Sequence, residues 1–483
     1  MNPPLPETAQ EEQKSSLVKN GAWGVIASVL QVLFVSLFFA IMARRYQPAV
    51  FGRFLVANTV YQIVASFSSM GLGQWFIRQY ALEHDKRFFT NKFLKLQAGM
   101  GMVFMLINMV VALVLYQDEQ IRVLCVVLGT NIVFDNFINA IKTLNVAEGE
   151  QRKSAIVLMV DGFLRLLVSA VLFIYPLSIV WLSVLVIAVR LLTLGIMLRL
   201  GSSSNINLLS LWRAPVLMAD AKQLVLDNWR FVVIGSISII YWRSGNIIIS
   251  KMLTLAHVAD YEVAFRFFSI LQILPLVASS TIYPQFIKYF NSRDLSALKN
   301  LYKNIFVLYT LFAITTYVFV YVFADKVIPI AFGNNYPGAV SCMQQMFLTI
   351  LVLPTVLLQA NLIVAMGLEK LDMWFNLISL TVHVTVSIVG LLFFKELQIV
   401  NYAVFASFIV FHLLQDVFLI RKEMIMVRHA VLFYLVVVLT AISCQYGSAY
   451  IHPYLLFAFF LMLVVVCGLY FILAQRRLQQ AVK

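Results

Sequence analysis

Long apolar runs constrain the fold of this chain more than any other feature of its sequence. Hydrophobic residues make up 61% of the 483 residues, and charged residues only 12%. Many runs exceed the ~18 residues at which an apolar stretch is read as a membrane-spanning helix. A chain with a mean hydropathy of +0.88 would not stay dissolved as a globular domain. We therefore expect an all-α polytopic membrane protein with about 14 transmembrane helices.

An internal duplication divides these runs into two similar sets. The segment 146–152 recurs loosely as the segment 364–370, and each copy lies between two apolar runs. A second, weaker internal similarity aligns the segment 51–78 with the segment 260–285. Two halves in the same order predict two six-helix repeated bundles around a central cavity, with the substrate path between them.

The runs and the segments between them predict six parts of the chain. These are a cytoplasmic N-terminal tail (1–20), an N-terminal six-helix bundle (21–199), a cytoplasmic amphipathic linker (200–229), a C-terminal six-helix bundle (230–422), accessory helices 13 and 14 (423–475) and a cytoplasmic tail (476–483). The tail lacks the pattern of a secretory signal, so we expect the first apolar run to be retained. The linker alternates apolar and charged residues, which is typical of a helix lying on a membrane surface, although a plain connector fits equally well.

Basic residues predict the orientation of the spans. Alternate loops carry most of the lysines and arginines, and such loops stay in the cytoplasm. Both termini are therefore expected to be cytoplasmic. The formal charge of +14 then reflects this topology together with contact with anionic membrane lipids, and no soluble domain is expected to bind nucleic acid.

Charged residues inside the spans are the strongest functional signal, because each costs on the order of 3 kcal/mol at the bilayer centre. The arginines within apolar runs are Arg165, Arg190, Arg243 and Arg266. The acids at similar depth are Asp135, Asp161 and Asp416. An interior lined by these spans is therefore expected to be net cationic, which suits an anionic substrate.

Several of these charges have a structural alternative. Asp161 and Arg165 are four residues apart on one helix face and could neutralise each other. His412 and Asp416 repeat that spacing, as a structural hydrogen bond or as a protonation site. Arg190, near the cytoplasmic end of its span, could extend its side chain to the headgroups.

The neighbouring residues in the sequence suggest candidates for substrate binding and for ion coupling. Arg243 and Arg266 are expected to line the path and bind substrate, with Arg78 and Arg165 added to the same cationic surface. The candidate ion-coupling residues are Asp135, Asp161, His412 and Asp416. Asp135 also lies in a stripe of asparagines that could instead hold helices together.

Enzymatic functions find no support in the sequence. It contains no GxxxxGK[ST] phosphate loop, no HExxH and no credible Ser/His/Asp set. The four cysteines show no CxxC or Cys/His spacing, so we expect neither a metal site nor a cofactor. A transporter, a channel and a structural scaffold remain, and duplication within one chain favours a transporter with alternating access.

Four short motifs carry a family resemblance. Phe51-Gly52-Arg53-Phe54 looks like an FGxY turn, Gly71 to Arg78 like a GL...R span ending, and the segment 260–264 like the xYxxA element of a second half. The segment 327–339 is similar to the "llfGxxYxxA" outer loop. In order and spacing the chain resembles the polysaccharide (Wzx-type) flippases of the multidrug, oligosaccharide-lipid and polysaccharide exporter (MOP) superfamily, over essentially residues 15 to 475.

The resemblance implies a function. It implies a secondary transporter in the cytoplasmic (inner) membrane that moves undecaprenyl-diphosphate-linked oligosaccharide for cell-surface polysaccharide assembly, such as O-antigen, lipopolysaccharide or exopolysaccharide. A polysaccharide polymerase and a chain-length regulator are the candidate protein partners. The alternatives are a multidrug exporter or a lipid II flippase of the same superfamily, or a non-transporting scaffold of a polysaccharide assembly complex.

Overall fold

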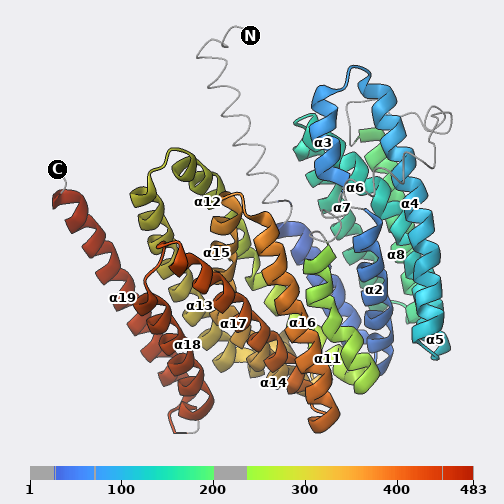
Figure 1. Ribbon diagram of the computed structural model, residues 1–483. Helices are drawn as coiled ribbons and strands as arrows, with labels where there is room; N and C mark the ends of the chain where they lie inside the picture. Colours follow the sequence, from blue (N-terminus) through green and yellow to red (C-terminus); the bar gives the residue numbers. More distant parts are fainter. Residues whose placement is uncertain (1–26, 28, 70–71, 201–235, 449, 482–483) are drawn as a thin grey trace. The chain divides into compact units, whose positions relative to one another are not determined.

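The described part of the chain folds into helices (Figure 1). A computed structural model describes residues 27, 29–69, 72–200, 236–448 and 450–481. Every regular element in these ranges is a helix. Twelve continuous helical stretches, some of which join two or three consecutive helices, are long and apolar enough to cross a membrane. The helical residues 29–45 and 236–252 lie next to the segments outside the description. With these two helices, the structure confirms the expected all-α polytopic fold.

Two compact units make up the chain, Met1–Ile247 and Ile248–Lys483. In the first unit the helix at residues 29–45 is followed by α2 (Pro48–Ser68), α3 (Leu72–Leu82), α4 (Lys86–Leu115), α5 (Glu119–Gly129), α6 (Asn131–Ala147), α7 (Gln151–Ala170), the short η1 (Val171–Phe173) and α8 (Ile179–Leu200). The second unit contains α11 (Leu255–Leu271), α12 (Ile273–Asn291), α13 (Leu295–Phe332), α14 (Pro337–Met346), η2 (Phe347–Leu351), α15 (Leu353–Ala365), α16 (Glu369–Phe394), α17 (Leu397–Arg421), α18 (Val427–Gly447) and α19 (Pro453–Ala481).

The two units repeat the same helix order and the same pairs of packed helices. In unit 1, α5 packs on α2, α6 packs on α3 and α4, and α8 packs on α5, α6 and α7. In unit 2, α14 packs on α11, α15 packs on α12 and α13, and α17 packs on α14, α15 and α16. The duplication read from the sequence is therefore also a duplication of packing.

The repeated segments 146–152 and 364–370 have the same structural role in the two units. Gly149 and Gly367 have φ angles of 76° and 77°, a left-handed conformation that glycine adopts without steric cost. The N–H of Glu150 donates to the carbonyl of Asn145, and the N–H of Leu368 donates to that of Ile363. This six-residue hydrogen bond closes the end of a helix, so each copy terminates α6 or α15 and starts the next span.

Aspartates begin three helices in the same way. The side chains of Asp85, Asp118 and Asp294 accept hydrogen bonds from backbone N–H groups in the first turns of α4, α5 and α13. Each carboxylate satisfies a donor that has no partner within the helix. These caps set the first residue of three long helices.

Several sequence-based boundaries fall on undescribed residues or differ in detail. The expected tail 1–20 and residues 201–229 of the expected linker lie outside the described residues. The helices α18 and α19, at the positions of the expected accessory pair, pack against α13. The last helix continues to Ala481, beyond the expected end at 475, because its polar residues are good helix formers.

Candidate functional site

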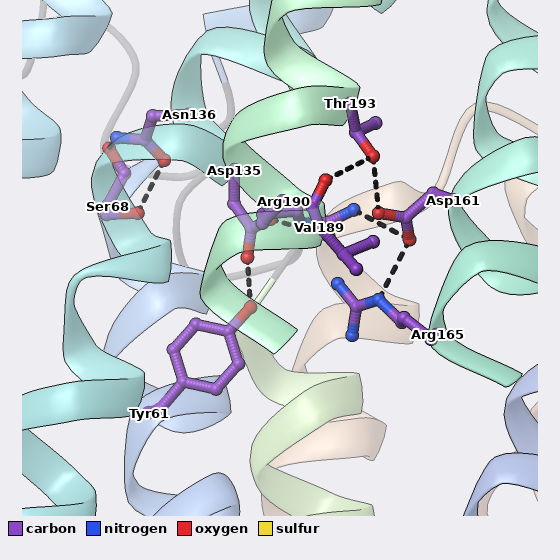
Figure 2. A network of polar contacts seen from close by, with 9 residues as sticks. All are labelled: Tyr61, Ser68, Asp135, Asn136, Asp161, Arg165, Val189, Arg190 and Thr193. Atoms are coloured by element: carbon purple, nitrogen blue, oxygen red, sulfur yellow. Dashed lines mark hydrogen bonds and ion pairs between the residues drawn. The ribbon is translucent and has the colours of Figure 1, made fainter. Parts of the chain in front are cut away.

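A network of charged side chains is buried among α2, α6, α7 and α8 of unit 1 (Figure 2). Arg190 Nη2 of α8 lies 2.5 Å from Asp135 Oδ1 of α6, and Arg190 Nη1 lies 3.1 Å from Asp161 Oδ2 of α7. The hydroxyl of Tyr61, on α2, donates to the second oxygen of Asp135. Arg190 therefore joins two carboxylates that come from two different helices.

Asp161 is held from both sides in the same network. Arg165 Nε, one turn along α7, lies 3.0 Å from Asp161 Oδ2. The hydroxyl of Thr193 donates to Asp161 Oδ1 at 2.9 Å. Asp161 is only 2% exposed. Two arginines and two aspartates make the network neutral, which is the condition under which ionised groups can remain buried.

These contacts decide between the alternatives for the charges in unit 1. Asp161 and Arg165 do form the intrahelical pair that their spacing allows. Arg190 does not extend to the headgroups, because its side chain is 14% exposed and contacts Asp135 and Asp161. The interpretation of Arg190 as a residue at the membrane surface was therefore wrong, since its guanidinium lies between two buried carboxylates of neighbouring helices.

An asparagine beside this network joins three helices. Asn136, on α6, accepts a hydrogen bond of 2.7 Å from the hydroxyl of Ser68 on α2. Its amide nitrogen donates to the backbone carbonyls of Ser68 and of Gln97, the latter on α4. The polar stripe on α6 thus holds helices together, as one of its two interpretations predicted.

Unit 2 contains a second buried network, centred on α17. His412 Nδ1 lies 2.9 Å from Asp416 Oδ2, one turn away, so this pair forms as its spacing allows. Gln359 of α15 donates to Asp416 Oδ1 at 2.7 Å and also contacts the hydroxyl of Tyr302 of α13. The hydroxyl of Tyr434 of α18 donates to Asp416 Oδ2 at 2.8 Å. The network therefore draws side chains from four helices.

Sequence reasoning missed most partners in both networks. Tyr61, Thr193, Gln359 and Tyr434 were not singled out, because neutral polar residues are common in membrane helices and carry no spacing signal. Tyr434 is the least expected of them, since its helix α18 lies outside the duplicated part of the chain. Only the packing of the helices shows that these side chains meet the charged groups.

The remaining candidates have different surroundings. Arg266 of α11 forms an ion pair with Glu262 one turn earlier, and both are buried. Arg243 lies half-buried in the helix at residues 236–252, one turn before Asn246, which donates to Thr59 of α2 at 3.0 Å. Arg78 is exposed on α3.

Pairing lowers the positive charge that the sequence predicted for the interior. Among the four arginines within spans, Arg165, Arg190 and Arg266 each contact a carboxylate. The structure also holds no group of three or more His, Cys, Asp or Glu side chains placed to bind a metal ion, within the residues that it describes.

Comparison with a collection of family models places this fold among known proteins. Residues 41–341 match the model of a family described as polysaccharide biosynthesis protein. A comparison of the sequence with curated proteins finds no match.

Solved structures share the fold at low sequence identity. The lipid II flippase MurJ in an inward closed conformation is 12% identical, with a TM-score of 0.72 over 95% of this chain and 99% of that one. An inward-facing multidrug resistance MATE family transporter of the MOP superfamily is 12% identical, with a TM-score of 0.67 over 81% of this chain and 94% of that one. A MOP superfamily transporter from Pyrococcus furiosus is 12% identical, with a TM-score of 0.59 over 85% of this chain and 96% of that one.

Proposed function

Because the chain belongs to the polysaccharide biosynthesis protein family and has the fold of MOP superfamily transporters, we propose that it is a flippase for undecaprenyl-diphosphate-linked oligosaccharides. It acts in the cytoplasmic membrane, with both termini in the cytoplasm, and supplies units for a cell-surface polysaccharide. Its binding partners are the lipid-linked oligosaccharide and the surrounding lipids, with a polysaccharide polymerase and a chain-length regulator as candidate protein partners.

The family match over residues 41–341 is the observation that carries this proposal. It covers all the helices from α2 to α13, including the buried network of unit 1. The likeness to a lipid II flippase over 95% of the chain supports a lipid-linked substrate. A membrane protein with this fold can carry such a substrate by exposing it first to one side of the membrane and then to the other.

The charge of a diphosphate gives the reaction its direction. A group with about two negative charges that leaves a negative-inside cell gains about 2.3 kcal/mol per charge per 100 mV. A cation within the spans would favour binding of that group. Arg243 is the main candidate, because it is half-buried and its neighbour Asn246 ties its helix to α2.

The other arginines also have parts in the proposal. Arg266 would have to exchange Glu262 for a phosphate oxygen, and Arg165 would have to exchange Asp161. Arg78, exposed on α3, is placed to meet a headgroup without giving up a partner in this way. We propose Arg243 and Arg266 as the main contacts to the diphosphate, with Arg78 and Arg165 as weaker contacts on the same cationic surface.

The pairing of three buried acids with arginines supports this proposal over a multidrug exporter for cationic drugs. A cationic drug needs a carboxylate that is free to receive it. Asp135, Asp161 and Glu262 each contact an arginine instead. A flippase for lipid II remains the second candidate, because the fold similarity to MurJ covers nearly the whole of both chains.

Purified protein in liposomes tests the proposed function directly. Vesicles carry an undecaprenyl-diphosphate-linked oligosaccharide in the inner leaflet, and its appearance in the outer leaflet is measured with an impermeant sugar-modifying enzyme. We expect flipping that accelerates with a membrane potential. Arg243→Ala should abolish it, whereas Arg243→Lys should retain part, because lysine keeps the charge but loses the two-pronged hydrogen bond to phosphate.

Matched controls make this test specific. Arg199→Ala removes an exposed arginine from the last turn of α8 and should flip at the wild-type rate. Equal rates for the wild type and Arg243→Ala at matched amounts of folded protein would reject the role of Arg243. No flipping by the wild type would favour the scaffold reading, and faster flipping of lipid II than of the oligosaccharide lipid would favour the second candidate.

A further inference from the structure

The buried charge networks of the two units differ in the cation that faces the carboxylate. In unit 1, Asp135 and Asp161 contact guanidinium groups, which stay protonated at every pH that a cell meets. In unit 2, Asp416 contacts the imidazole of His412, a group that gains or loses a proton near physiological pH. The second network is therefore the one in which the partner of the carboxylate is itself a group that can gain and lose a proton.

The hydrogen bonds around Asp416 identify the nitrogen of His412 that is available. Gln359 Nε2 donates to Asp416 Oδ1, and the Tyr434 hydroxyl donates to Asp416 Oδ2. The only hydrogen of that hydroxyl is thereby used, so its oxygen accepts from His412 Nδ1 at 2.7 Å. The donor and acceptor roles thus assign the neutral imidazole a hydrogen on Nδ1 and a lone pair on Nε2.

The lone pair of Nε2 is buried and has no hydrogen-bond partner among the described residues. His412 itself is 0% exposed. The ring of Phe433 stacks on the imidazole with centroids 4.7 Å apart and planes inclined by 14°, and the ring of Phe306 lies 6.2 Å away. An aromatic face stabilises a cation above it, so the Phe433 ring would offset part of the cost of burying an imidazolium.

The titratable groups around this site come from three neighbouring helices. Tyr434 comes from α18, and Tyr302 of α13 reaches Asp416 through Gln359. From α16, Asp372 contacts Gln415, the residue before Asp416. Helix α15 contributes Gln359, and α14 and η2 contribute no charged group with a contact to this site within the described residues. Among the residues that the structure describes, Asp416 is therefore the carboxylate in direct contact with His412.

We infer that Nε2 of His412 is a proton-binding site that couples the transport cycle to a pH gradient, with Asp416 as its fixed counter-ion. This inference rests on the proposed function. A proton adds to the Nε2 lone pair, no other bond forms or breaks, and the carboxylate of Asp416 stays ionised. The His412–Asp416 pair changes from a net charge of −1 to zero, and release of the proton on the other side of the membrane restores it.

A change of charge at this site would act on several helices at once. An unpaired carboxylate is costly in a buried position, whereas an imidazolium–carboxylate pair is tolerated. The conformation that closes α13, α15 and α18 around α17 is therefore favoured when Nε2 carries a proton. The conformation that admits water to the site is favoured when it does not.

Proton binding can be measured without any substrate. The protein contains six histidines, and spectra of protein labelled with ¹⁵N-histidine in lipid bilayers report the protonation of each imidazole nitrogen. The signals missing from His412→Asn belong to His412. We expect them to change from the Nδ1–H form to the imidazolium as the pH of the sample is lowered. A single unchanged form at every pH at which the protein stays folded would overturn the inference.

The choice of variants separates a lost proton site from a lost hydrogen bond. Asparagine at 412 offers an amide nitrogen near the position of Nδ1, so it can still donate to Tyr434, but it has no basic nitrogen. His383→Asn is the matched control, because His383 is also fully buried on a neighbouring helix but contacts Ser387 instead of a carboxylate. Both variants should titrate as the wild type does at every other histidine.

Transport then tests the coupling itself in the liposomes described above. For one proton per cycle, a pH difference of one unit should shift the steady outer-to-inner ratio of the oligosaccharide lipid about tenfold. The shift should disappear in His412→Asn and persist in His383→Asn. The quantity compared is the ratio with and without the gradient, so a general loss of rate does not imitate the effect.

The outcomes distinguish this inference from the proposed function. Flipping that responds to membrane potential but not to a pH gradient in the wild type would reject coupling and leave the proposed function intact. A pH response that survives in His412→Asn would reject His412 as its site. If the wild type flips no oligosaccharide lipid, the proposed function fails and coupling fails with it, whereas the spectra still decide whether Nε2 binds a proton.

Discussion

Arg190 shows at the scale of one residue how this protein keeps charges inside a membrane. A single arginine within a span is unfavourable, and so is a single aspartate, but Arg190 contacts Asp135 and Asp161 together. The arrangement does not require a net energetic gain over apolar side chains. It does require that all partners be present, because removal of one leaves a buried charge unpaired.

Arg190→Met therefore has a large predicted effect on stability. The substitution leaves Asp135 without a cationic contact among the described residues, and loss of one partner of a buried ion pair costs about 3–5 kcal/mol. Thermal unfolding in detergent should show a clear drop in midpoint. Arg199→Met on the same helix is the control, because its side chain is exposed, and it should unfold as the wild type does. The double variant Arg190→Met/Asp135→Asn should recover part of the loss. Equal unfolding midpoints for Arg190→Met and Arg199→Met would contradict the prediction.

At the scale of single helices, two glycines of α4 offer a matched pair of sites. A Cβ atom at Gly101 would lie 2.9 Å from the backbone Cα of Val133 on α6, whereas a Cβ atom at Gly99 would meet nothing within 4 Å. Backbone atoms cannot move aside as a flexible side chain can. The close approach of α4 to α6 therefore depends on glycine at 101 but not at 99.

Alanine at these two positions should have opposite effects. Gly101→Ala should destabilise the protein by about 1–3 kcal/mol, because it forces α4 away from α6. Gly99→Ala should be neutral or stabilising by up to about 1 kcal/mol, since alanine favours the helix more than glycine does. Denaturation of both variants in the same detergent measures the difference. A Gly101→Ala protein as stable as the Gly99→Ala protein would show that the two helices do not need their close contact.

The start of α5 provides a prediction on pH. Partial burial tends to raise the pKa of Asp118, but the hydrogen bonds from Arg53 and from the Ile121 N–H outweigh it, so the pKa is lower than usual. A carboxyl with a lowered folded-state pKa contributes stability that is present above its unfolded pKa, about 4, and is lost as pH falls through the folded value.

Asp118→Ala should test both the cap and its pH dependence. We expect a loss of about 1 kcal/mol near neutral pH, and the difference from the wild type should shrink as the pH falls below about 4. Glu119→Ala is the control, because Glu119 is exposed in the same turn and makes no cap. A difference that stays constant down to the lowest usable pH would assign the effect to packing and not to the charge.

At the scale of the whole molecule, the orientation in the membrane is the open prediction. The loop before α13 is one of the alternate loops that carry most of the lysines and arginines, so it should face the cytoplasm. The loop before α14 should face outward. Single cysteines at Ser296, in the first turn of α13, and at Asn335, in the loop before α14, lie at exposed positions and report on these two sides. In a Cys467→Ser background, which removes the exposed native cysteine, an impermeant thiol reagent should label Asn335→Cys in intact cells. It should label Ser296→Cys only after the membrane is opened; the reverse pattern would invert the topology.

The sequence alone was sufficient for the class, the helices and the duplication. Apolar runs of this length have few ways to satisfy their backbone groups in lipid other than a helix, so hydropathy predicts the spans. The repeat at Gly149 and Gly367 could be recognised in the sequence because each copy ends a helix with a residue in the left-handed conformation. That role depends only on neighbouring residues. Pairs one turn apart, such as Asp161 with Arg165, were predictable for the same reason: helix geometry is local.

Only the tertiary structure decided which charges are neutralised and by which helices. Arg190 lies 29 residues from Asp161 and 55 from Asp135, and no periodicity connects positions that far apart. Tyr434 meets His412 because α18 packs beside the duplicated bundle, a contact that neither helix encodes by itself. The number of charged residues within the spans can be read from the sequence. Which of these charges are neutralised depends on distances between side chains of different helices, and helix packing sets those distances.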